Sequence, residues 1–215
     1  PSAADRASTG PGLMHPAAPF RVADAHVVLA HLAAHPLMAL FAVCEAGPRV
    51  AHAPVLARRD GEGIALDFHL SRNNALTTAF ASGAVALAVS QGPDAYVSPD
   101  WYAAADQVPT WNYLTVEAEG EVAPLDEPGL VALLDDLSAH EEARLAPKTP
   151  WTRHKMSPGR FEAMLAGIQG FRLRPHRLEA TFKLSQNKPV DERARVAAAL
   201  GDHPIAQAMR RNPTD

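Results

Sequence analysis

Two stretches of the chain alternate large apolar and smaller or polar side chains with a period of two. Between residues 63 and 70 the apolar positions are Ile64, Leu66, Phe68 and Leu70, and residues 113–119 follow the same pattern. Successive side chains of a strand point to opposite faces, so this period predicts half-buried strands. It also favours antiparallel pairing, because antiparallel sheets commonly keep one face solvated. His69 is then expected on the face opposite Phe68.

Other stretches extend the expected sheet. Residues 37–45 and 84–89 are continuous apolar runs and predict buried strands, while residues 49–58 return as a strand in which Pro54 indicates an edge or a bulge. Residues 171–184 predict two strand segments broken at Pro175. The sum is six to eight short strands.

Helices are expected between the strands. Asp24 is suited to cap a helix that Pro36 ends, and Asp126 or Glu127 begins another that runs to about Leu145. Residues 159–167 and 191–211 also have helical patterns. The sequence therefore predicts an α+β domain, a closed or split β-barrel with peripheral helices. We expect a flexible arm over residues 1–19, the barrel domain over 20–200 and a helical tail over 201–215.

Composition narrows the classes of function. The 215 residues are 47% hydrophobic and 20% charged, with a net charge of −4, and no apolar run reaches the roughly 18 residues of a membrane helix. The acidic balance argues against direct nucleic-acid binding, which normally shows a basic surface. The first residues lack a secretion signal pattern, so we expect a cytoplasmic protein without membrane contact. Cys44 stands alone in an apolar run and is expected to be buried.

Aromatic residues gather between Ser90 and Gly120. This stretch contains two of the three Trp and all three Tyr, punctuated by prolines. One interpretation is that Trp101, Tyr102, Trp111 and Tyr113 fill a core. The other is a loop that forms the wall of a pocket for a flat ligand. The polar residues Gln91, Asp94 and Asn112 favour the second, since pockets combine apolar walls with a few polar groups.

A possible phosphate site follows the strand at 63–70. Ser71, Asn73 or Asn74 is suited to cap a short helix, and Arg72 lies at its start. Helix N-termini offer free N–H groups to anions, and arginine adds a bidentate donor. The alternative is an ordinary capped surface helix.

The ten histidines predict no metal site. His31 and His35 lie four residues apart, on one face of a helix, but without a third ligand we expect them on a solvated surface. The HEEAR segment around His140 has Arg144 where the second histidine of a zinc-protease motif would stand. No Ser–His–Asp arrangement is assigned, so the catalytic residues remain unknown.

Eight ordered segments between about Met14 and Leu200 resemble the PaiB-type family of FMN-binding negative transcriptional regulators. They are MHPAAPF, AHAPVL, FHLSRNNAL, SQGPDAYVSPDWY, VPTWNY, HEEA, GIQGF and FKLSQNK. The resemblance implies a split barrel related to the pyridoxamine phosphate oxidase fold, in a homodimer with FMN at the subunit interface.

The resemblance also implies a set of cofactor contacts. The phosphate would lie at Ser71, Arg72 and Asn73, close to His69, and the ring region would be formed by segments from different parts of the chain. The expected cofactor-binding residues are His69, Ser71, Arg72, Asn73, Gln91, Trp111, Asn112, Lys183, Ser185 and Gln186.

The chain departs from the family pattern in several places. Asp94 stands where the family tends to have histidine. The residues AAADQ precede VPTWNY, where the family usually has a basic residue, and SRNNAL lacks the proline of the family's ARANP. Fewer positive charges beside the aromatic stretch weaken the case for an anionic flavin.

Three functions follow as hypotheses. The first is an FMN-dependent oxidoreductase or a flavin-linked regulator that takes a small-molecule ligand. The second is a heme-binding or heme-dependent protein, with His52, His69 and His140 as candidate ligands. The third is a transcriptional repressor without catalysis, for which no DNA-binding motif is found.

Overall fold

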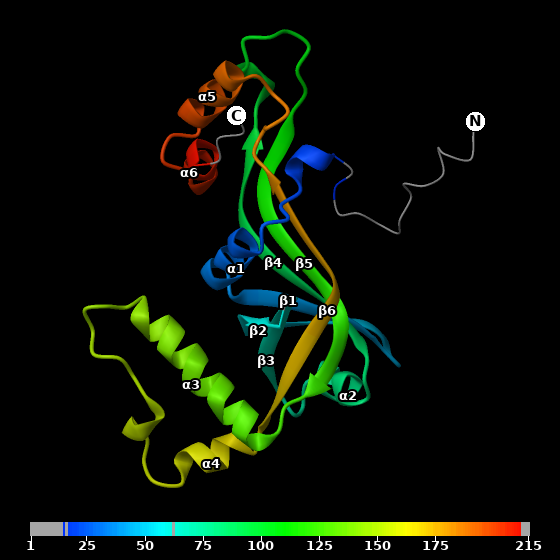
Figure 1. Ribbon diagram of the computed structural model, residues 1–215, viewed down its shortest axis with the longest axis vertical. Helices are drawn as coiled ribbons and strands as arrows, with labels where there is room; N and C mark the ends of the chain where they lie inside the picture. Colours follow the sequence, from blue (N-terminus) through cyan, green and yellow to red (C-terminus); the bar gives the residue numbers. More distant parts are fainter. Residues whose placement is uncertain (1–14, 16, 62, 212–215) are drawn as a thin grey trace. The chain divides into compact units, whose positions relative to one another are not determined.

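The computed structural model describes residue 15 and residues 17–61 and 63–211 (Figure 1). The strands are β1 (Leu37–Cys44), β2 (Gly47–Asp60), β3 (Gly63–Ser71), β4 (Val85–Val97), β5 (Thr110–Pro124) and β6 (Ile168–Lys183). The α-helices are α1 (Ala25–Ala34), α2 (Ala75–Ala81), α3 (Glu127–Ala143), α4 (Arg160–Leu165), α5 (Val190–Ala199) and α6 (Pro204–Arg211). Three short 3-10 turns, η2 (Ala18–Phe20), η3 (Pro99–Trp101) and η4 (Arg153–Lys155), complete the described elements.

The six strands form a closed barrel in the order β1-β2-β3-β6-β5-β4, which confirms the predicted α+β barrel. The pairings of β1 with β2, β2 with β3, β3 with β6 and β1 with β4 are all antiparallel. Pro54 pairs with Leu37 at the last position of the β1 ladder, and the β3 ladder begins at Val55. The proline therefore stands where one partner strand ends and the next begins, so its missing N–H interrupts neither ladder.

The strands are longer than the sequence patterns predicted. β6 runs without a break from Ile168 to Lys183, so the expected interruption at Pro175 is wrong. Pro175 lies beyond Leu173, where the ladder with β3 ends. Gly120 of β5 lies against this backbone, and a Cβ at Gly120 would come within 2.7 Å of the Pro175 Cα. A glycine opposite the proline thus allows β5 and β6 to stay paired.

The chain divides into two compact units. Unit 1 contains residues 1–28, 91–116 and 179–215, and unit 2 contains residues 29–90 and 117–178. Strands β4, β5 and β6 each contribute residues to both units. The predicted division into an arm, a barrel domain and a tail remains a prediction. Residues 1–14 and 16 of the arm and residues 212–215 of the tail lie outside the described residues.

The core of unit 2 lies between the β-sheet and two helices. Phe68 of β3, Phe80 of α2 and Phe171 of β6 are fully buried, with ring centroids 5.6–5.8 Å apart. Strand β3 is buried on both faces, because α3 packs over β2 and β3 on the side away from these rings. The prediction of a half-buried β3 is therefore wrong.

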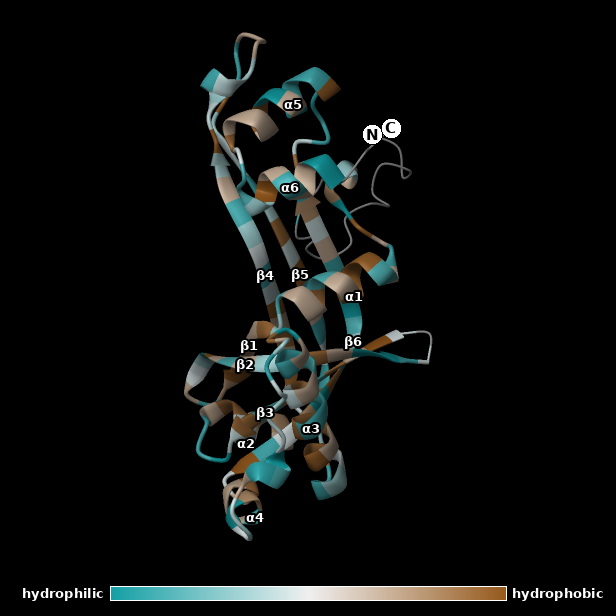
Figure 2. Cartoon of the chain, turned by 90° about the vertical axis from the view of Figure 1, so that its left-hand side faces the viewer, coloured by the Kyte–Doolittle hydropathy of each residue, from teal (hydrophilic) through white to brown (hydrophobic). Residues whose placement is uncertain are grey.

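Strand β1, in contrast, is less buried than the sequence predicted. Its side chains alternate, with Met38, Leu40 and Ala42 buried, whereas Leu37, Phe41 and Val43 are exposed. β4 alternates too, and brown and teal segments follow one another along β4 and β5 in Figure 2. The continuous apolar runs at 37–45 and 84–89 thus do not mark fully buried strands. Cys44 at the end of β1 is only half-buried, so its predicted burial is wrong as well.

Unit 1 builds its core from α5, α6 and the strand ends assigned to it. Val196 of α5 and Ile205 and Met209 of α6 are buried there together with Leu184. The carboxylate of Glu192, a buried residue of α5, accepts hydrogen bonds of 2.9–3.1 Å from the backbone N–H groups of Ala103 and Ala104. This carboxylate fixes the start of the segment that connects η3 to β5.

Local signals set the helix ends. The Asp24 carboxylate accepts from the His26 N–H, Asn74 accepts from Leu76, and Asp126 accepts from Gly129. These caps satisfy backbone donors that the first turn leaves unpaired, as predicted for Asp24 and Asp126. No helix among the described residues is long and apolar enough to cross a membrane.

Candidate functional site

The turn after β3 presents three consecutive polar side chains. Ser71, Arg72 and Asn73 are all exposed, and Asn74 caps α2 behind them. Arg72 is fixed twice to the segment before β6, because its N–H donates to the Gly167 carbonyl and its Nε donates to the Ala166 carbonyl, at 2.9 and 3.0 Å. The guanidinium is therefore held in place before any ligand arrives.

A small cavity of about 190 Å³ lies beside Arg72. Asp126, Glu127 and Glu162 line it, whereas Ser71 and Asn73 do not. Three carboxylates around one guanidinium oppose an anion inside this cavity. The hydrogen-bonding groups of Ser71 and Asn73 lie outside this acidic cavity, on the exposed side of the turn.

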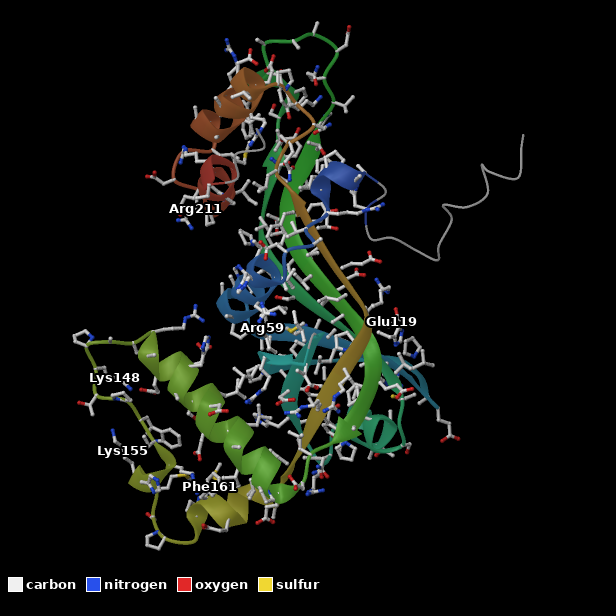
Figure 3. The ribbon with its side chains drawn as sticks, in the orientation of Figure 1. Arg59, Glu119, Lys148, Lys155, Phe161 and Arg211 are labelled. Atoms are coloured by element: carbon white, nitrogen blue, oxygen red, sulfur yellow. The ribbon has the colours of Figure 1, made fainter. Side chains whose placement is uncertain are left out.

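His69, two residues before Ser71 on β3, lines a different cavity. This second cavity has a volume of about 330 Å³, and its walls come from β3, α3, α4, β6 and the segment around Trp151. Burial lowers the pKa of His69 below the ordinary value of histidine, so its imidazole is neutral at pH 7. Figure 3 labels Phe161 of α4, one of the aromatic side chains of this wall.

In unit 1 the predicted residues form a buried polar pair. Asn112 of β5 is fully buried, and its Nδ2 donates to the Ser185 hydroxyl at 3.0 Å and contacts the Met209 sulfur at 3.6 Å. Ser185 has a φ of 61°, a left-handed conformation that a non-glycine residue adopts at a cost of about 1 kcal/mol or more. This backbone turn places the hydroxyl against Asn112.

Lys183 lies at the end of β6. Its Nζ donates to the Thr110 hydroxyl at 2.6 Å and lies 5.9 Å from the centre of the Phe20 ring. Burial lowers the pKa of Lys183 below its ordinary value, because the ammonium loses part of its hydration. Gln186 binds the backbone of Leu184 and Phe182, so its amide shapes the turn.

The aromatic stretch is neither a filled core nor a single loop. Residues 90–97 continue β4, and residues 110–120 belong to β5. Trp111 is 54% exposed and meets Tyr96, 46% exposed, edge to face at 6.1 Å, whereas Tyr102 is buried. Gln91 is exposed on β4. The Tyr96–Trp111 pair offers an open aromatic surface in unit 1.

The ten residues predicted to bind the cofactor therefore form two sets. His69, Ser71, Arg72 and Asn73 lie together in unit 2, and Gln91, Trp111, Asn112, Lys183, Ser185 and Gln186 belong to unit 1. No pattern in the sequence predicts the cavity lined by His69. Trp151 lines this cavity as well, and no local pattern links it to His69.

The other histidines show one clear correction. His31 is 5% exposed and its Nε2 lies 3.3 Å from the Ser90 carbonyl, so the predicted solvated surface is wrong. His140 contacts the Ala33 carbonyl and His52 is exposed on β2. No group of three or more potential metal ligands occurs in the part of the chain that the structure describes.

Comparison with known proteins identifies the family. Residues 14–177 match the family described as "Putative FMN-binding domain". A Bacillus subtilis relative, "Protease synthase and sporulation protein PAI 2", is 30% identical over 141 residues, which are 66% of this chain and 67% of the relative.

Two solved structures share the fold. The FAD and heme binding protein of Mycobacterium smegmatis superposes with a TM-score of 0.57 at 18% identity, covering 85% of this chain and 80% of its own. The flavocytochrome Anf3 of Azotobacter vinelandii has a TM-score of 0.54 at 16% identity, covering 81% and 75%. At these identities the two structures establish the split-barrel fold alone. The family match over most of the sequence shows that this chain belongs to the PaiB-type family of FMN-binding split-barrel proteins.

Proposed function

We propose that the chain binds FMN and acts as an FMN-dependent oxidoreductase. The observation that carries the proposal is the turn Ser71–Arg72–Asn73, whose arginine is anchored to two backbone carbonyls and whose side chains are exposed. An anchored guanidinium flanked by a hydroxyl and an amide suits a phosphate monoester, the one strongly anionic group of FMN. When bound, the flavin supplies the hydride or electron chemistry, and the protein supplies position and polarity.

The residues of unit 1 are proposed contacts of the flavin ring. Asn112, Gln91 and Gln186 carry amides, which both donate and accept hydrogen bonds as the ring's carbonyl and nitrogen atoms require. The exposed face of Trp111 suits stacking on a flat ring. Lys183 and Ser185 add a cation and a hydroxyl near the end of β6. His69, the remaining residue of the expected set, lies two residues before the phosphate turn but lines another cavity, so we leave it out of the proposed FMN contacts.

We also propose that the protein is a homodimer. Leu37, Phe41 and Val43 on β1 point to one face and are exposed, and Val50 of β2 pairs with Phe41 and is exposed as well. Contiguous apolar side chains of this kind mark interaction surfaces in soluble proteins. A second copy of the chain carries the same apolar face, so an isologous contact would bury both.

The experiment is a titration of the purified protein with FMN, followed by the quenching of flavin fluorescence. Arg72→Ala should weaken binding about 10- to 100-fold, as expected for the loss of charge-assisted hydrogen bonds. Arg160→Ala, at another exposed arginine of unit 2, is the matched control and should leave affinity unchanged. Equal affinities for the wild type and Arg72→Ala would refute the assignment of the phosphate to this turn.

The proposed oxidoreductase activity needs a measurement separate from FMN binding. Bound FMN should be reduced by dithionite and reoxidised by an added acceptor dye while it stays on the protein. A protein that binds FMN but releases it on reduction would serve as a sensor or regulator instead. Stoichiometric uptake of heme, with a sharp Soret band and no flavin binding, would favour the heme alternative named in the sequence analysis.

A further inference from the structure

We propose that unit 2 carries a second ligand site, the cavity lined by His69, which takes a neutral bicyclic aromatic molecule bearing a carbonyl oxygen. The cavity has a volume of about 330 Å³. Its walls are formed mainly by Leu134, Trp151, Met156, Phe161, Met164 and Ile168. The proposal goes beyond FMN binding and does not depend on it.

The walls favour a flat apolar ligand. Phe161 and Trp151 provide aromatic faces, and Met156 and Met164 provide flexible thioethers that adapt to aromatic rings. An engineered cavity of about 150 Å³ holds one benzene ring, so about twice that volume suits two fused rings. The ligand class is therefore set by both the size and the composition of the cavity.

The charges at the rim cancel, which argues for a neutral ligand. Arg153 donates from Nε to both carboxylate oxygens of Asp135, at 2.9 and 3.1 Å, and its guanidinium lies 4.9 Å from the centre of the Phe161 ring. Both charged residues line the cavity and are paired with each other. An anionic ligand would have to displace the carboxylate of Asp135 from the guanidinium.

His69 gives the cavity one specific polar group. Its Nδ1 is buried without a hydrogen-bond partner, and among the described residues nothing pairs with the other ring nitrogen either. A buried unpaired N–H costs more than a buried unpaired lone pair, so the proton of the neutral imidazole belongs on Nε2. Nε2–H is a donor, and its natural partner in an apolar cavity is a carbonyl oxygen of the ligand.

The site is distinct from the phosphate turn. Arg72 lines the smaller cavity of about 190 Å³, and Leu165 lines both cavities. Ser71, Arg72 and Asn73 are absent from the lining of the cavity that contains His69. FMN and the bicyclic ligand should therefore bind without competition.

The test is isothermal titration calorimetry of the full chain with coumarin and with naphthalene. Both probes have two fused six-membered rings, but only coumarin has a carbonyl. The wild type should bind coumarin more tightly than naphthalene. His69→Phe, which keeps a ring but removes the donor, should weaken coumarin binding about five- to tenfold and leave naphthalene binding unchanged. His176→Phe, at an exposed histidine of β6, is the matched control.

A second variant tests the cavity independently, in case His69→Phe does not fold. Met164 is 55% exposed on α4, so Met164→Trp should fold and fill the cavity, weakening both probes at least tenfold. Wild-type protein that binds neither probe would overturn the proposal. Equal loss of both probes in His69→Phe would overturn the role of the donor. Competition between coumarin and FMN would overturn the separate site and make the cavity part of the flavin site. FMN binding that fails while coumarin binds would contradict only the proposed function.

Discussion

Asp67 of β3 and Arg172 of β6 are direct partners in the strand register and form a bidentate ion pair, with both N···O distances at 2.7 Å. Asp67 is 1% exposed, and Arg58 of β2 approaches the same carboxylate from the other side, with its Nε at 3.1 Å. The hydrogen bonds that Arg172 donates to the Asp67 carboxylate raise the pKa of Arg172. One buried carboxylate therefore joins three neighbouring strands beneath α3.

Removing this carboxylate should destabilise unit 2. Asp67→Ala leaves Arg172 without its bidentate partner, and because Arg172 is partly exposed the cost is expected at about 2–3 kcal/mol, below that of a fully buried pair. Urea unfolding followed by circular dichroism measures this loss. Asp60→Ala, which breaks the more exposed pair with Arg174, is the control and should cost less than about 1 kcal/mol. Similar losses in the two variants would contradict the role given to Asp67.

Gly120 is required by the close approach of β5 to β6. A Cβ at this position would lie 2.1 Å from the Arg174 carbonyl oxygen, which is backbone and cannot rotate away. Gly120→Ala should therefore cost at least about 2–3 kcal/mol, at the upper end of overpacking penalties. Gly63→Ala meets its nearest atom at 3.6 Å without a positive φ and is the matched control. Thermal unfolding of both variants gives the comparison, and an unchanged midpoint for Gly120→Ala would show that the strands are farther apart.

His31 should make stability depend on pH. Burial lowers its pKa to about 4, with the hydrogen bond to Ser90 opposing the shift and His35 adding to it. The unfolded chain binds a proton at pH values below about 6.5, whereas the folded protein resists it until about pH 4. Stability is therefore complete above pH 6.5 and falls as the pH drops toward 4, by about 3 kcal/mol at most from this residue.

His31→Leu should reduce that slope. Unfolding free energies measured at pH 7 and pH 5 should differ less in this variant than in the wild type. His35 and His69 also have pKa values lowered by burial, so part of the slope should remain. His154→Gln, at an exposed histidine, should keep the wild-type slope. A slope that is the same in His31→Leu would show that His31 is not buried in the neutral form.

The apolar face of β1 should control the oligomeric state. Val43 is 76% exposed, so Val43→Glu changes the surface without entering the core. Sedimentation or light scattering should find a dimer for the wild type and a monomer for the variant, with the same circular dichroism. Arg59→Glu on β2, away from this face, should remain a dimer. A wild-type monomer at high micromolar concentration would refute the proposed homodimer.

Local sequence patterns were sufficient to predict most strands and helices of the fold. Period-two patterns found the strands around Phe68 and Val116, and the polar caps Asp24 and Asp126 found the starts of two helices. The patterns failed where a distant residue changes the outcome. Pro175 was predicted to break a strand, but Gly120 accommodates it. The period-two pattern predicted a half-buried β3, but Asp67 on that strand is buried and pairs with Arg172, 105 positions away.

The candidate site shows the same limit. The turn Ser71–Asn73 follows from a strand pattern and a capping signal, both local. The cavity around His69 combines residues from β3, α3, α4 and η4, which no spacing in the sequence connects. Likewise His31 was expected in solvent because a helical pattern alone does not show that its face is covered.

FMN binding is best tested by the absorption spectrum of the protein, purified without added cofactor and then incubated with FMN and, separately, with heme. We expect a two-banded flavin spectrum that stays with the protein through gel filtration and has a lower absorbance in Arg72→Ala. A protein that retains no flavin after incubation would contradict FMN binding. A Soret band without flavin uptake would also contradict FMN binding, and would indicate that this chain binds heme instead.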